Sequence, residues 1–268
     1  MFSNMIIGRY MPGDSWIHHL DARTKLVLSV AFIFVVFLAN NIIGYALAAV
    51  FTLVAILMTG LGVGVFLRGI RPLVLLMLIT TILQLFFVQT GDVLIHLGFI
   101  KITTDGVINS LTVFVRFVLI IMFSTILTLT TPPLAVADGM ESLLRPLKKF
   151  KFPVAELALM LSIALRFVPT LLDEAVTIMN AQRARGVNFN EGSIVARIKA
   201  FVPLLIPLFI NAIKRAIELG DAMEARGYRG GDHRTKYRVL TWQKQDTLAV
   251  VIFVIFAVAL LATRWLEF

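Results

Sequence analysis

The chain has 268 residues, of which 59% are hydrophobic and only 15% charged, and its mean hydropathy is +0.89. This composition excludes an ordinary soluble domain and is typical of a protein that lies in a lipid bilayer. The net charge of +9 is concentrated between Pro132 and Lys244, where 17 basic residues stand against 10 acidic ones, which favours cytoplasmic segments of a membrane protein over a nucleic-acid-binding surface.

Five apolar stretches are long enough, or nearly long enough, to cross a bilayer as helices. They are Leu26 to Ala39, Ile42 to Met58, Leu73 to Val88, Val107 to Leu129 and Thr247 to Ala262. Because about 20 residues span the hydrocarbon core, one helix from Leu26 to Met58 would be too long, and Asn40-Asn41 indicates a turn between two spans. The sequence therefore predicts an all-α, polytopic membrane protein with about five transmembrane helices.

Basic residues alternate across these spans. Arg23 and Lys25 flank the first span, and Arg68 and Arg71 separate the second from the third, whereas the segment 89–106 carries a single basic residue. By the positive-inside rule, the N-terminus and the long basic region are then cytoplasmic. With five spans, the C-terminus would lie outside.

Arg116 is the ionisable residue that lies deep in a predicted span. Such a charge often marks a substrate or ion pathway, because it is costly to keep in hydrocarbon. The alternative is a structural arginine that bonds carbonyls or a carboxylate of a neighbouring helix. Since the other spans hold no Asp, Glu or His for a proton relay, the structural interpretation is favoured.

The basic region is itself predicted to be helical. Leu134 to Leu144 is a short amphipathic helix, and Val154 to Val168 is an apolar segment, interrupted by Glu156 and Arg166, that is either a buried helix or a sixth span. Two longer amphipathic helices follow, Leu171 to Arg185 and Ser193 to Arg226, each with polar and apolar residues recurring at helical spacing on opposite faces.

Both long helices end in the same three residues, Ala184-Arg185-Gly186 and Ala225-Arg226-Gly227. One such triplet is an ordinary helix stop, because glycine adopts the left-handed conformation past a helix and arginine suits the negative end of the helix dipole. Two matched triplets instead favour a pair of projecting cations that bind similar receptors. Arginine carries a permanent charge and a planar fork suited to carboxylates.

The sequence contains no motif for catalysis or for nucleotide binding. It lacks a phosphate-binding Gly-x-x-x-x-Gly-Lys-Ser/Thr loop, so the chain is not expected to hydrolyse ATP. Cysteine is absent, and the histidines His18, His19, His96 and His233 are scattered. We therefore expect no enzymatic activity and no catalytic, cofactor-binding or metal-binding residues.

These residues resemble the transmembrane component of energy-coupling factor (ECF) transporters, of the EcfT/CbiQ type. The resemblance covers nearly the whole chain and includes the segment from Gly8 to Leu26, the apolar spans and both Ala-Arg-Gly triplets. Ala22 departs from the Asp-Pro-Arg-Thr-Lys that is usual in the family, since this chain reads Asp21-Ala22-Arg23-Thr24-Lys25.

The resemblance implies a scaffold in the cell membrane that joins two cytoplasmic ABC ATPases, of the EcfA and EcfA′ type, to a substrate-binding S-component that captures a vitamin or a metal ion. ATP would be bound by the partner subunits only. Arg185 would contact one ATPase and Arg226 the other. The implied organisation is a cytoplasmic N-terminal segment (1–25), four transmembrane helices (26–131), a cytoplasmic coupling region (132–245) and a C-terminal transmembrane helix (246–268).

Two alternatives remain open from the residues alone. A stand-alone secondary transporter would need a site near the bilayer midplane, where the spans offer only Arg116 as a charge. A substrate-capturing membrane subunit is normally smaller and would not need the long basic region.

Overall fold

The computed structural model describes residues 10–88, 90–97, 100–150, 153–189, 191, 193–228, 230 and 240–264. The chain divides into two compact units, the first made of Met1–Ser142 with Leu240–Phe268 and the second of Leu143–Val239. Gly8 and His233, which enter the predictions above, lie outside the described residues.

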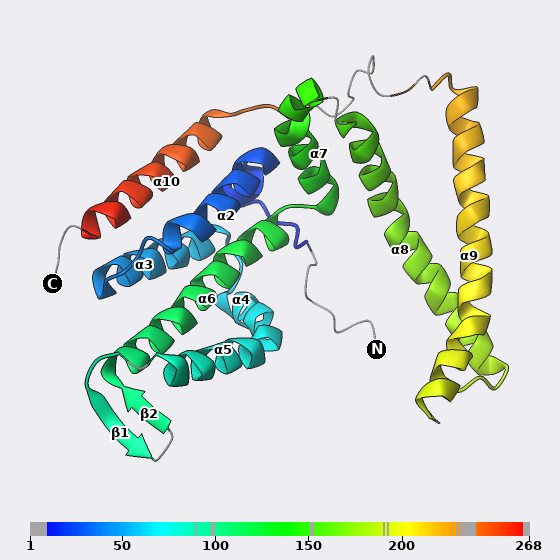
Figure 1. Cartoon of the computed structure of the whole chain (residues 1–268). Helices are drawn as coiled ribbons and strands as arrows, with labels where there is room; N and C mark the ends of the chain where they lie inside the picture. The colour runs from blue at the N-terminus through cyan, green and yellow to red at the C-terminus, as the bar shows by residue number, and fades with distance from the viewer. Residues whose placement is uncertain are drawn as a thin grey trace. The chain divides into compact units, whose positions relative to one another are not determined.

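The first unit is built around one long helix, α6 (Thr104–Thr130), which contacts α2, α3, α4 and α5 (Figure 1). The antiparallel hairpin of β1 and β2 joins α5 to α6, and α10 returns the chain to α2 and α3. The further elements of this unit are α1 (Trp16–His19), α2 (Ala22–Val36), α3 (Ile42–Met58), α4 (Val63–Ile70), η2 (Arg71–Leu73), α5 (Val74–Phe87), β1 (Val93–Leu97), β2 (Ile100–Thr103), α7 (Pro133–Leu144) and α10 (Lys244–Thr263).

The predicted helical membrane protein is confirmed, and so is the turn at Asn40-Asn41, because α2 ends at Val36 and α3 begins at Ile42. The third predicted span is longer than expected, since Pro72 lies in the short η2 that connects α4 with α5. The hairpin of β1 and β2 was not predicted.

Among the described residues, five helical segments are long and apolar enough to cross a membrane: Val63–Phe87, Thr104–Thr130, Val154–Ala184, Arg197–Ala225 and Lys244–Thr263. The number of candidate spans matches the prediction, but two of the five segments are not those that were predicted. The helices at the first two predicted spans, α2 and α3, have only 15 and 17 residues. Val154–Ala184 and Arg197–Ala225 of the basic region meet the criteria of length and mean hydropathy instead. These two criteria do not take account of the polar stripe along one face of each helix.

Five phenylalanines from four helices form the centre of the first unit. Phe32 of α2 is fully buried and stacks on Phe123 of α6 with ring centroids 4.0 Å apart, and Phe51 of α3 stacks on Phe256 of α10 at 4.1 Å. Phe253 of α10 meets Phe51 edge-on. Stacked pairs of this kind contribute about 0.5–1.5 kcal/mol beyond the area they bury, so they fix these helices against one another.

The outer surface of the first unit is also apolar. Large side chains such as Phe34, Ile42 and Phe87 are 70%, 89% and 79% exposed. An apolar surface of this extent is unfavourable in water and matches a lipid environment. The first unit therefore has a packed interior and a surface suited to the bilayer.

The second unit contains η3 (Arg145–Phe150) and two long helices, α8 (Val154–Ala184) and α9 (Ile194–Ala225), which lie side by side and antiparallel (Figure 1). The segments Val154 to Val168 and Leu171 to Arg185 were treated as separate helices, but the chain continues through Pro169 as the single helix α8. Proline removes one backbone hydrogen bond, and the remaining bonds of a 31-residue helix maintain it on both sides.

Candidate functional site

The end of α8 is a glycine-capped turn. Gly186 has a φ of 89°, its N–H donates to the Arg183 carbonyl at 2.9 Å, and the Val187 N–H donates to the Gln182 carbonyl at 3.0 Å. This pair of bonds is the Schellman motif, which requires the left-handed conformation at the residue after the cap. Glycine adopts that conformation without the steric cost that a side chain brings. Arg185 is the cap residue itself.

The end of α9 repeats this geometry. Gly227 has a φ of 73°, its N–H donates to the Glu224 carbonyl at 2.8 Å, and the Tyr228 N–H donates to the Met223 carbonyl at 3.0 Å. Arg226 therefore occupies the same cap position as Arg185. The helix stops expected from both triplets are confirmed, and the two arginines are presented by the same local backbone.

Both caps project into open space. All six residues of the triplets are exposed, and a methyl group built on Gly186 or Gly227 would meet no atom within 4 Å. Within the described part of the chain, the guanidinium groups of Arg185 and Arg226 form no ion pair or hydrogen bond. The two charges are thus available to a partner.

The structure does not bring the two triplets together. Because α8 and α9 are antiparallel, the triplets lie at opposite ends of the helix pair (Figure 1). With 31 and 32 residues at a rise of about 1.5 Å each, the helices separate their two caps by roughly 45 Å. No single small molecule could contact both.

Polar contacts hold the middle of the helix pair. The Asn211 amide of α9 donates to the Glu174 carboxylate of α8, and Arg215 lies 3.5 Å from the other oxygen of that carboxylate. The Arg215 guanidinium also lies 5.8 Å from the centre of the Phe167 ring. Near the connection between the helices, the buried Phe189 packs against Phe201 with ring centroids 5.5 Å apart.

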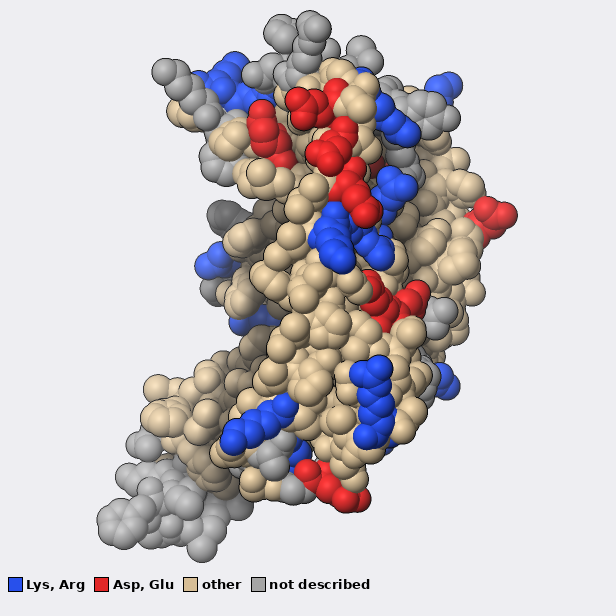
Figure 2. Space-filling view, turned by 90° about the vertical axis from the view of Figure 1, so that its right-hand side faces the viewer, with Lys and Arg blue, Asp and Glu red and all other residues tan. Residues whose placement is uncertain are grey.

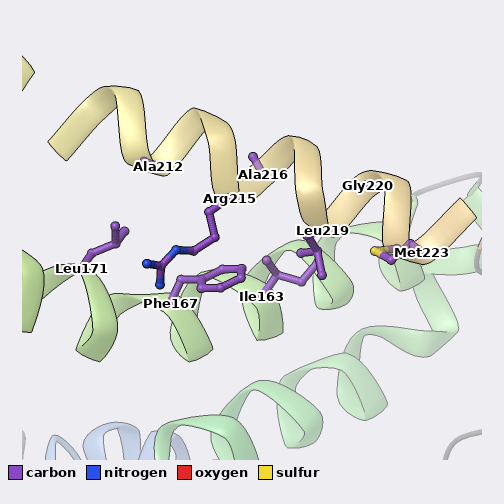
Figure 3. A pocket seen from close by; sticks show the side chains of 9 residues that line it. All are labelled: Ile163, Phe167, Leu171, Ala212, Arg215, Ala216, Leu219, Gly220 and Met223. Carbon is purple, nitrogen blue, oxygen red and sulfur yellow. The ribbon is translucent and has the colours of Figure 1, made fainter. Parts of the chain in front are cut away.

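A groove of about 330 Å³ lies between α8 and α9, beside these contacts (Figure 3). Figure 3 shows the Arg215 side chain reaching from α9 toward Phe167 of α8, while small residues of α9 leave space next to it. The lining consists of Ile163, Phe167, Leu171, Ala212, Arg215, Ala216, Leu219, Gly220 and Met223. The helix pair is incompletely packed along this stretch.

The α9 helix carries a long uncharged stretch between Lys199 and Lys214. Figure 2 shows a band of acidic and basic side chains that runs from the upper part of this face to its middle, with uncharged surface around it and further charged side chains lower down. The apolar side chains of this stretch that are more than two-fifths exposed are Phe201, Val202, Leu205, Ile206, Phe209, Ile210 and Ile213. This surface is available to lipid or to another membrane protein.

A second polar cluster, which the sequence analysis did not assign a role, lies in the first unit. We call it the polar junction, and it consists of Asp21, Arg23, Lys25 and Asp246. Arg23 and Asp21 form an ion pair with a shortest distance of 2.7 Å. The Asp21 carboxylate also caps α2 by accepting the Arg23 backbone N–H at 2.8 Å. Its hydrogen bonds with the Arg23 guanidinium raise the pKa of Arg23.

The other two members of the polar junction satisfy backbone groups. Asp246 is fully buried and accepts the N–H groups of Asp21 and Gln243, each at 2.8 Å. Lys25, just before the first apolar stretch, donates to the carbonyls of His18 and Thr130, each at 3.1 Å. Burial lowers the pKa of Lys25 to about 8, although the carboxylates of Asp246 and Asp21 oppose this shift.

Arg116 of α6 has a structural partner. Its guanidinium donates to the Tyr45 hydroxyl of α3 at 2.5 and 3.1 Å and lies 4.8 Å from the centre of the Phe37 ring. The partner is a phenol oxygen where a carbonyl or carboxylate was expected. These contacts favour the structural role over a transport pathway.

His18 and His19 are involved in local contacts. The His18 ring bonds the Ser15 hydroxyl at 2.7 Å and the Met11 carbonyl at 3.1 Å, and the His19 ring lies 3.5 Å from Asp14. Within the described residues, no group of three or more His, Cys, Asp or Glu side chains is placed to hold a metal ion.

The chain is similar to known membrane proteins over nearly its whole length. A profile of the family described as "Cobalt transport protein" (CbiQ) matches residues 13–237. The energy-coupling factor transporter transmembrane protein EcfT of Lactococcus lactis subsp. cremoris (strain MG1363) is 53% identical over 258 residues, which are 96% of this chain and 97% of that protein.

Two further relatives carry the same printed name, energy-coupling factor transporter transmembrane protein EcfT. The one from Lacticaseibacillus paracasei is 56% identical over 245 residues, covering 91% of this chain and 93% of that protein. The one from Bacillus subtilis (strain 168) is 47% identical over 264 residues, covering 98% of this chain and 100% of that protein. With such identity over both lengths, the chain belongs to the EcfT/CbiQ family of energy-coupling factor transporter transmembrane proteins.

Proposed function

We propose that this chain is the membrane scaffold of an ATP-driven importer and couples two ABC ATPase subunits to a membrane subunit that captures a vitamin or a metal ion. The observation that carries the proposal is the duplicated cap, in which Arg185 and Arg226 stand on the same backbone geometry and are both exposed. The chain itself has no catalytic role, and ATP is bound by its partners.

Each cap is suited to a groove that contains carboxylates. The guanidinium is permanently charged and can bind a carboxylate through two parallel hydrogen bonds. The exposed Ala184 and Ala225 beside the arginines let another surface approach closely. Because the caps are roughly 45 Å apart along the helices, each requires its own receptor, which supports two ATPase subunits.

The exposed apolar stretch of α9 supports a second contact, with the substrate-capturing subunit. Phe209 is 68% exposed and Ile206 is 55% exposed, so a membrane protein that lies on them would bury apolar area. The charge distribution favours a cytoplasmic position for the caps, because basic segments remain on the inner side of the membrane.

Coupling requires that the helix pair have two arrangements whose balance depends on the nucleotide state of the ATPases. Closure of two ATPases that hold opposite ends of α8 and α9 would shift the helices relative to each other. The incompletely packed groove between them supports such a shift, since few contacts must be broken there. The capturing subunit that lies on α9 would then be reoriented and would release its cargo inward.

The test is co-purification of the ATPases with charge-reversed variants. Arg185→Glu and Arg226→Glu should each weaken the association, and the double variant should abolish it, because losing one partner of a buried interfacial charge pair costs about 2–5 kcal/mol. Lys214→Glu is the matched control, since it makes the same charge change at an exposed position of α9, about three turns before the cap. It should retain both ATPases.

Full assembly of the complex by the double variant would rule out the docking role. The same preparations separate the alternatives. Transport in liposomes without ATP would identify a secondary transporter, and retention of labelled vitamin by the chain alone would identify a capturing subunit.

A further inference from the structure

Arg23 lies where the chain leaves the first unit and where it returns. The first unit ends at Ser142 and resumes at Leu240, and the 97 residues between them form the second unit. The Arg23 guanidinium contacts the residues on both sides of this segment, Ser142 and Leu240. Its Nη2 donates to the Leu240 carbonyl at 3.2 Å, and its Nη1 lies 3.5 Å from the Ser142 hydroxyl.

The Arg23 side chain is itself held in place. Three contacts to the Asp21 carboxylate, at 2.7, 3.2 and 3.2 Å, fix the plane of the guanidinium. Asp21 is tied in turn to α10, because its N–H donates to the fully buried Asp246. The Arg23 side chain is therefore held in one orientation by Asp21, and Asp21 is held in turn by Asp246 of α10.

The structure around the exit point is also close-packed. A methyl group added to Gly139 of α7 would meet Leu26 at 3.0 Å and the Ala22 backbone at 3.3 Å. The helix that leads to Ser142 therefore packs directly on the first turns of α2. Both chain connections thus lie against the helix that carries Arg23.

We propose that Arg23 is a positioning residue that holds together Ser142 and Leu240, the two connections by which the first unit leads to and from the α8 and α9 pair. With Ser142 and Leu240 both held on α2, the two points at which the chain leaves and re-enters the first unit stay together when α8 or α9 moves. This inference rests on the proposed coupling function, and it assigns Arg23 no contact with cargo, ATP or ATPase.

Arginine is suited to this role because its fork has donors on two sides. While Nη2 contacts Leu240 and Asp21, Nη1 faces Ser142. A lysine ammonium could pair with Asp21 but, as a single point of charge, could not face both connections. Arg23→Lys should therefore retain the fold and lose part of the coupling.

The first measurement is hydrogen–deuterium exchange on the full-length chain in detergent. Arg23→Ala should speed exchange by about tenfold in peptides that cover Ser142 and Leu240, because hydrogen bonds of a charged group are lost there, and should leave the caps unchanged. Arg71→Ala removes a cation from an exposed position elsewhere in the first unit and should change neither peptide. Unchanged exchange at both connections in Arg23→Ala would overturn the proposal.

The second measurement is uptake per ATP hydrolysed, in liposomes that contain the full complex with a vitamin-capturing subunit and its tritiated vitamin. Arg23→Ala should keep the ATPases bound and active while uptake per ATP falls severalfold, with Arg23→Lys intermediate. The chain has no native cysteine, so Ser142→Cys and Leu240→Cys can be joined by a short bismaleimide. This crosslink in the Arg23→Ala background should restore coupling.

An unchanged ratio of uptake to ATP hydrolysis in Arg23→Ala would overturn the positioning role even if exchange at the connections rises. Failure of the proposed function would look different. The wild-type chain would then bring down no ATPase, whereas exchange at the connections would still respond to Arg23→Ala.

Discussion

The polar junction of the first unit and the polar contacts of the α8 and α9 pair use similar side chains with different results. In the polar junction, Asp246 is fully buried, the Asp21 side chain is 2% exposed, and both carboxylates accept several hydrogen bonds. In the helix pair, the Glu174 and Arg215 side chains are 20% and 35% exposed, and the Glu174 oxygen nearest Arg215 accepts no hydrogen bond.

This difference fits the proposed function, in which the first unit is fixed and the helix pair moves. A buried and satisfied network has one arrangement, because any displacement leaves charged groups without partners. A partly exposed network loses less when it shifts, since water can replace some of the broken contacts. The first unit is therefore suited to be a frame, and the helix pair is suited to have two states.

The largest expected effect is a difference in the free energy of unfolding between two Phe→Ala variants, one in each region. Phe32→Ala should destabilise the first unit by about 3–5 kcal/mol, because the ring is fully buried and stacked on Phe123. Phe167→Ala, on the half-buried wall of the groove between α8 and α9, should cost about 1 kcal/mol or less. Thermal unfolding of both variants in the same detergent measures the difference. Equal losses would contradict the division into a frame and a movable pair.

The caps were predictable from the sequence because a Schellman turn depends on residues within one turn of the glycine. The break between α2 and α3 followed from Asn40-Asn41 for the same local reason. The polar junction was not predictable, since Asp21 and Asp246 are 225 residues apart, and Arg23 and Leu240 are 217 apart. Local patterns do not report which distant backbone groups a buried charge will satisfy.

The continuity of α8 was missed for a related reason. Proline inside a helical pattern is a breaker by local rules, and Pro169 would end a short helix. In a 31-residue helix the bonds on both sides outweigh the one that is lost. The sequence thus predicted the class of fold and both candidate arginines, while the arrangement of the helices that carry them required the structure.

The next effect compares two carboxylates changed to amides. Asp246→Asn should destabilise the chain by about 1–3 kcal/mol, because Asp246 accepts a backbone N–H on each oxygen and an amide has only one acceptor oxygen. Glu174→Gln should cost less than about 1 kcal/mol, since the site is partly exposed and the Gln oxygen can still accept from Asn211. Chemical unfolding of both variants gives the two values. A larger loss for Glu174→Gln would show that the helix pair, and not the polar junction, is the more rigid region.

The smallest effects separate the two kinds of glycine in the helix pair. Gly186→Ala and Gly227→Ala each place a side chain at positive φ, so each cap should lose about 1 kcal/mol. Nothing in the surroundings adds to this strain, because both sites are open. Gly220→Ala is the matched control, since Gly220 lies within α9 in an equally open place and alanine favours a helix interior by about 1 kcal/mol.

These changes should appear as faster hydrogen exchange in the last turn of α8 or α9 for the cap variants, with Gly220→Ala unchanged or slower, and with the first unit unaffected. If the two caps serve only to end helices, their fraying should leave ATPase binding intact. If they present Arg185 and Arg226 to separate receptors, each Gly→Ala substitution should weaken ATPase binding at its own end of the helix pair. The weakening should grow with the stability that the cap loses. The cap substitutions therefore test the geometry of the arginines without altering their charge, which the charge-reversed variants cannot do.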